Sequence, residues 1–205
     1  MPSYLKILFV PAVLLWLWHP QAWALDIGPL LATCPQHDPV YSQLRSDFEL
    51  RRNGVSVRDI PCSEPISQLP VSQYTDEIIV VQGLRAVFYM LGSSPLRWAP
   101  GMRLYDWMQS KMAGINISDT AGFSSCCEIL DGKWFFTLQA QNDSERNFDR
   151  GWSGISANIG LYAHELRHLD GFPHTSCCGI PNGCDQTYDE TNLSPYGMQW
   201  WLNAH

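Results

Sequence analysis

Three of the six histidines in this 205-residue chain lie within eleven residues, at His164, His168 and His174, and Glu165 follows the first of them. A spacing of four places His164 and His168 one turn apart on the same face of a helix. Gly171 accepts the left-handed conformation in which helices often end. We therefore expect a helix that stops at Gly171, followed by a reversal that brings His174 back toward the other two histidines.

These residue types suit a catalytic zinc site. Zn²⁺ binds imidazole nitrogens at about 2.0–2.1 Å in a tetrahedron, and catalytic sites leave one position for water. We expect His164, His168 and His174 to bind the metal and Glu165 to act as general base toward that water, whose pKa zinc lowers to about 7. Glu190 is an alternative third ligand. His174 has the stronger case, because both Gly171 and His174 fit the expected reversal. A structural histidine cluster is the other interpretation. The chance that a chain of this composition has three histidines, a glutamate and a glycine at these spacings is on the order of 10⁻⁵.

The run HELRHLDGFPH at residues 164–174 resembles the extended zinc signature of the metzincin metallopeptidases. That family also has a methionine in a tight turn beneath the metal, and residues 194–198 (SPYGM), which end at Met198, resemble that turn. The resemblance implies an antiparallel edge strand, upstream of the zinc helix, that holds a substrate peptide in an extended form. Residues 126–130 or 133–141 are the candidates for this strand.

Two dipeptides that favour positive φ, Asn53-Gly54 and Asp131-Gly132, predict β-hairpins over residues 48–57 and 127–141. Apolar residues at helical spacing predict helices over residues 75–91, over residues 103–112, and from Ser153 or Ser156 to Gly171. Hairpins with intervening helices indicate a single α+β domain. With the metzincin resemblance, we expect a small, twisted, mostly antiparallel sheet, a zinc-bearing active-site helix and a disulfide-rich C-terminal part.

Residues 1–24 have the pattern of a secretory signal peptide. Lys6 precedes an apolar run from Ile7 to Trp18, and Ala22 and Ala24 occupy the −3 and −1 positions of a cleavage site. A membrane anchor is the alternative, but the run is shorter than the roughly 20 residues that span a bilayer. We expect cleavage after Ala24 and a secreted or periplasmic protein with no membrane association.

The remaining chain is expected to form one compact unit of two parts. Residues 25–74 would be an N-terminal segment with the first hairpin and a connector that contains Pro61, Pro65 and Pro70. Residues 75–205 would be the zinc metallopeptidase-like core.

The seven cysteines indicate disulfide bonds in an exported chain. Cys34 and Cys62 flank the N-terminal segment, Cys126 and Cys127 are adjacent, and three more cysteines (Cys177, Cys178 and Cys184) follow the histidines. The pairing cannot be deduced from the sequence, and an odd number leaves at least one thiol over. A cysteine-only zinc site has no CxxC spacing to support it.

The formal charge of −7, without a basic block, argues against a nucleic acid or an anionic membrane as the partner. We expect a secreted zinc-dependent endopeptidase that acts on a peptide or protein substrate. One alternative is a disulfide-stapled secreted binding protein whose zinc site is structural or vestigial. Another is a zinc amidase that acts on a non-protein amide, such as one in a cell-wall peptide.

Overall fold

The computed structural model describes residues 32–63, 75–90, 96, 98–121, 124–140 and 152–172, together with residues 195, 198 and 202; for residues 152–158 it describes the backbone alone. The expected signal peptide, most of the proline-containing connector, His174, Glu190 and the last three cysteines lie outside the described residues.

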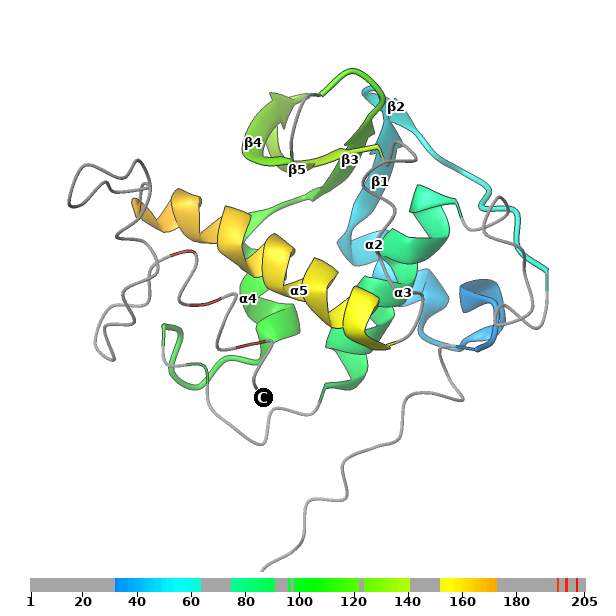
Figure 1. Ribbon diagram of the computed structural model, residues 1–205, viewed down its shortest axis with the longest axis horizontal. Helices are drawn as coiled ribbons and strands as arrows, with labels where there is room; N and C mark the ends of the chain where they lie inside the picture. The colour runs from blue at the N-terminus through cyan, green and yellow to red at the C-terminus, as the bar shows by residue number, and fades with distance from the viewer. Residues whose placement is uncertain are drawn as a thin grey trace, which may run out of the picture.

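Five strands form one sheet in the order β2-β1-β3-β5-β4 (Figure 1). The outer pairs, β1–β2 and β4–β5, are antiparallel, whereas the central pairs, β1–β3 and β3–β5, are parallel. The mixed α+β class is confirmed, but the expected mostly antiparallel sheet has two parallel pairings among its four. The strands are β1 (Glu49–Arg52), β2 (Val55–Ser56), β3 (Gly114–Ser118), β4 (Ser125–Leu130) and β5 (Lys133–Gln139).

Both predicted hairpins are confirmed, because their turn residues adopt positive φ. Asn53 and Gly54 have φ values of 50° and 79° between β1 and β2. Asp131 and Gly132 have φ values of 51° and 77° between β4 and β5. Two successive residues with positive φ match the right-handed twist of the flanking strands.

The predicted helices are also present, and Figure 1 shows α3, α4 and α5 on one side of the sheet. α3 begins after Thr75, whose hydroxyl accepts a hydrogen bond from the Ile78 amide at 3.4 Å. The buried face of the sheet packs against these helices, and the ring of Phe136 lies 5.4 Å from that of Tyr162. The helices are α2 (Tyr41–Asp47), α3 (Asp76–Tyr89), α4 (Leu104–Lys111) and α5 (Trp152–Arg167), with short 3₁₀ turns η1 (Pro35–His37) and η4 (His168–Asp170).

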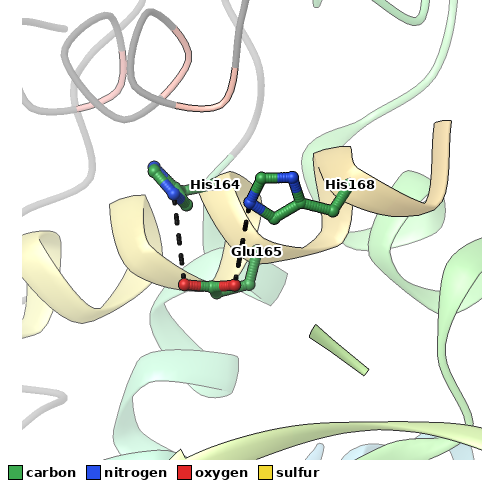
Figure 2. A group of neighbouring side chains, drawn as sticks. All are labelled: His164, Glu165 and His168. Atoms are coloured by element: carbon green, nitrogen blue, oxygen red, sulfur yellow. Dashed lines mark ion pairs between the residues drawn. The ribbon is translucent and has the colours of Figure 1, made fainter. Parts of the chain in front are cut away.

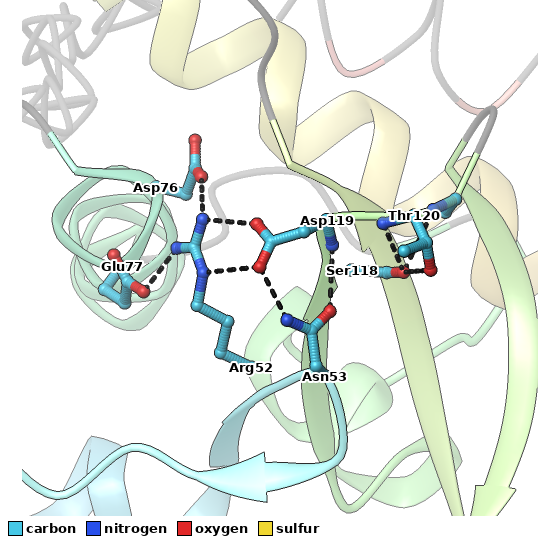
Figure 3. Close-up of polar contacts among 8 residues, drawn as sticks. Arg52, Asn53, Asp76, Glu77, Ser118, Asp119 and Thr120 are labelled. Carbon is cyan, nitrogen blue, oxygen red and sulfur yellow. Dashed lines mark hydrogen bonds and ion pairs between the residues drawn. The ribbon is translucent and has the colours of Figure 1, made fainter.

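Arg52 joins the first hairpin to two other elements (Figure 3). Its guanidinium bonds Glu77 at 2.6 Å in the first turn of α3 and Asp119 at 2.6 Å beyond the end of β3. The Asn53 side chain bonds Asp119 as well, at 2.5 Å. These hydrogen bonds, from Arg52 first and then Asn53, lower the pKa of Asp119. The contacts fix the end of the hairpin over the start of α3.

Two disulfides are present among the described residues. Cys34 bonds Cys62, 28 residues away, and Cys126 bonds Cys127. No helix in the described ranges is long and apolar enough to cross a membrane.

Met198 is fully buried and belongs to the core cluster, but its backbone is helical. Pro195 and Leu202 are also helical and buried. The other residues of the expected turn, at positions 194, 196 and 197, lie outside the described residues. The turn at residues 194–198 therefore stays a prediction.

Candidate metal centre

His164, Glu165 and His168 form one group at the end of α5 (Figure 2). Their potential ligand atoms all lie within 4.8 Å of one another. Nε2 of His164 is 4.0 Å from Oε1 of Glu165, and Nε2 of His168 is 4.0 Å from Oε2. Figure 2 shows both rings turned toward the carboxylate. The predicted proximity of these three residues is confirmed, and His174 lies outside the described residues.

The local backbone explains how His168 reaches this position. The α-helix ends at Arg167, and the chain tightens into a 3₁₀ turn from His168 to Asp170. Gly171 closes the turn with a φ of 85°, and its amide donates to the His168 carbonyl at 3.0 Å. The predicted left-handed helix end at Gly171 is confirmed, because a residue without Cβ adopts this conformation at no steric cost.

The second nitrogen of the His168 ring is already engaged. Nδ1 lies 2.7 Å from the carbonyl oxygen of Phe172, so Nδ1–H donates to this oxygen. The tautomer thus fixed carries its lone pair on Nε2, the atom that faces Glu165. Metal-binding histidines commonly donate their other ring N–H to a carbonyl or a carboxylate in this way.

A set of charged contacts holds the turn that follows His168. Asp170 bonds Lys111 at the end of α4 and Arg167 at 2.8 Å. The Arg167 guanidinium also lies 3.8 Å from the centre of the Phe172 ring. Phe172, whose carbonyl orients His168, is therefore tied to α4 through Arg167 and Asp170. Sequence reasoning missed Lys111, because 59 residues separate it from Asp170.

A hydrogen bond from the sheet holds the Glu165 carboxylate in place. Its Oε2 accepts a hydrogen bond from the backbone amide of Cys126, in β4, at 2.9 Å. Residues 126–130 were a candidate strand for holding a substrate, but the sequence did not indicate this contact. The contact matters because it places the start of an edge strand beside the carboxylate.

The described residues fit a zinc ion in both chemistry and spacing. Ligands at zinc distances in a tetrahedron lie about 3.3 Å apart. The three ligand atoms lie within 4.8 Å of one another. The distances between them would therefore shorten by no more than about 1.5 Å to surround the ion. Imidazole nitrogens are donors that zinc prefers, and the hydrogen bond to Phe172 leaves the lone pair of His168 on Nε2. The Glu165 carboxylate is near enough to serve as a ligand or as a base.

Comparison of the chain with protein-family models, curated proteins and solved structures finds no match.

Proposed function

We propose that this chain is an exported zinc-dependent endopeptidase. His164 and His168 would hold the metal together with His174, and Glu165 would serve as the general base. The observation that carries the proposal is the convergence of two imidazole Nε2 atoms on one carboxylate at the end of α5. The resemblance of residues 164–174 to the metzincin signature supports the same assignment.

A bound Zn²⁺ supplies a water of pKa about 7 and a positive charge that polarises a carbonyl. The chain's own part in the reaction falls to Glu165. The Cys126 amide holds its Oε2, and Oε1 is the oxygen that faces His164. We assign to Oε1 the proton from the attacking water and its delivery to the leaving amine.

β4 offers a way to align the substrate. It is the last strand of the sheet (Figure 1). The Cys126 amide, near its start, donates a hydrogen bond to Glu165. A peptide that adds to such an edge binds through main-chain hydrogen bonds, largely independent of its sequence. The peptide would then pass beside Glu165 in an extended form.

The experiment compares Glu165→Gln with the wild type for zinc content and digestion of casein. We expect the variant to keep about one zinc per chain and to lose at least about 100-fold in activity, because the amide cannot take the proton. Glu49→Gln, on β1 beside the far edge strand β2, is the matched control and should retain activity. Cleavage by a zinc-loaded Glu165→Gln protein would contradict the proposal.

Removing zinc with a chelator should abolish casein digestion, and adding zinc back should restore it. A protein that binds zinc tightly but cleaves no substrate would instead be the binding protein with a structural zinc site. Cleavage of a non-protein amide alone would identify the amidase. A substrate panel that contains casein, short peptides and cell-wall peptides distinguishes the endopeptidase, the binding protein and the amidase.

A further inference from the structure

We propose that Ile129 and Trp134 form a subsite that selects a large apolar or aromatic side chain of the substrate. The selected residue lies two or three positions N-terminal to the bond that is cleaved. This inference rests on the proposed peptidase function and adds a substrate preference to it.

The two side chains form an exposed apolar pair on the sheet. Ile129 is 58% exposed and Trp134 is 45% exposed, whereas most large apolar side chains in the described residues are buried. They lie directly opposite each other on β4 and β5. Side chains two residues apart on a strand share a face, so Trp134 is on the same face as the buried Phe136 and Leu138. The apolar face of the sheet therefore continues from the core into solvent at this pair.

The pair is continuous with the candidate site. β4 begins beside Glu165, where the Cys126 amide bonds the carboxylate, and runs from there toward Ile129. Ile129 is three positions after Cys126, and the register of β4 against β5 shifts between Ser125 and Glu128. The pair is thus about 7–10 Å along the strand from the candidate site.

The backbone of Ile129 is oriented to bind an added strand. Leu130 and Lys133 are paired and flank the two-residue turn. In such a hairpin the pair that flanks the turn is the hydrogen-bonded kind. In an antiparallel ladder the next pair, Ile129 and Trp134, is not hydrogen-bonded, so its N–H and C=O groups point away from the partner strand. For Ile129, this direction is the outer edge of the sheet.

Antiparallel addition is the more stable pairing per residue. Because β4 runs away from Glu165, an antiparallel peptide runs toward it, and the residue opposite Ile129 precedes the cleaved bond. Paired residues of neighbouring strands project to the same face, with Cβ atoms about 4.5–5.5 Å apart. A large apolar side chain at this position would cover Ile129 and reach toward Trp134, which removes apolar surface from water.

The test uses the full-length, zinc-loaded protein and a proteome-derived peptide library, with cleavage sites read by mass spectrometry. We expect enrichment of Phe, Tyr, Leu or Met two or three residues before the cleaved bond. Two synthetic peptides that differ only by Phe or Ser at the enriched position then give kcat/KM. The wild type should favour the Phe peptide about tenfold.

The double variant Ile129→Thr/Trp134→Thr should lower the ratio for the two peptides to about one, because the Phe peptide loses its advantage. Urea unfolding of the double variant beside the wild type shows that the variant is folded. The matched control Val55→Thr changes an exposed apolar side chain on the other hairpin and should keep the tenfold preference.

Three results would overturn the inference. They are an absence of apolar enrichment before the cleaved bond, enrichment only after it, and a preference that survives in the double variant. If cleavage still depends on Glu165 in these cases, the proposed peptidase function stands. If the wild type cleaves no peptide, both proposals fail.

Discussion

At the scale of single residues, Asp38 and Arg85 form an ion pair that is almost completely buried, with side chains 1% and 2% exposed. Burial raises the pKa of Asp38, but three hydrogen bonds and the charge of Arg85 outweigh burial and hold the pKa below its usual 3.8. The donors are the Val40 amide, the Arg85 guanidinium and the Tyr89 hydroxyl. The pair joins the segment before α2 to α3.

Asp38→Asn should lower the free energy of unfolding at pH 7 by about 3–5 kcal/mol, because Arg85 stays buried without a counter-charge. The folded-state pKa of Asp38 lies below the unfolded one. The contribution of the carboxylate is therefore present above about pH 4 and is lost as the pH falls through the folded-state value. Urea unfolding of both proteins should be measured from pH 7 to pH 3. The difference between their free energies of unfolding should shrink below about pH 4. A difference that does not change with pH would contradict this.

At the scale of elements, Gly114 sets how closely β1 and β3 can pair. It lies opposite Glu49 in the parallel register. A Cβ at this position would overlap the Glu49 carbonyl and come within 2.8 Å of the Phe135 ring. Neither obstacle is the end of a flexible side chain, so the strands themselves would have to separate.

Gly114→Ala should therefore destabilise the fold by about 3 kcal/mol or more, at the upper end of the range for overpacking. Gly132→Asn is the contrasting control, since a Cβ there meets nothing within 4 Å and asparagine tolerates positive φ. We expect the control to change stability by less than about 1 kcal/mol. Urea unfolding measures both, and an effect of Gly114→Ala no larger than that of the control would contradict this explanation.

At the scale of the whole molecule, the Cys34–Cys62 disulfide closes a loop that contains α2 and the first hairpin. This loop carries β1, to which the rest of the sheet pairs through β3. The disulfide therefore restrains the N-terminal segment as part of the same fold.

Replacing Cys34 and Cys62 together with Ala should lower the free energy of unfolding by about 3–4 kcal/mol, from the added entropy of an unfolded loop of this length. Urea denaturation of the oxidised wild type and the double variant gives the difference. A reductant should destabilise the wild type and leave the double variant less affected. Equal stability of the two proteins would mean that the segment is held by its other contacts alone.

Local features were predictable from the sequence because they depend on residues close together in the chain. The positive φ values at Asn53-Gly54 and Asp131-Gly132 follow from the conformational preferences of those residues. The shared face of His164 and His168 follows from the helical repeat, and the end of the turn follows from Gly171.

Only the tertiary structure decided the features that join distant residues. These are the two parallel pairings of β3, the hydrogen bond from Cys126 to Glu165 across 39 residues, and the Lys111–Asp170 ion pair across 59. No local pattern encodes such contacts, because they form only when packing of the helices on the sheet brings the partners together. The same packing buries Met198 in the core. The sequence by itself determined which side chains stand at the candidate site, and the packed sheet decided what orients them.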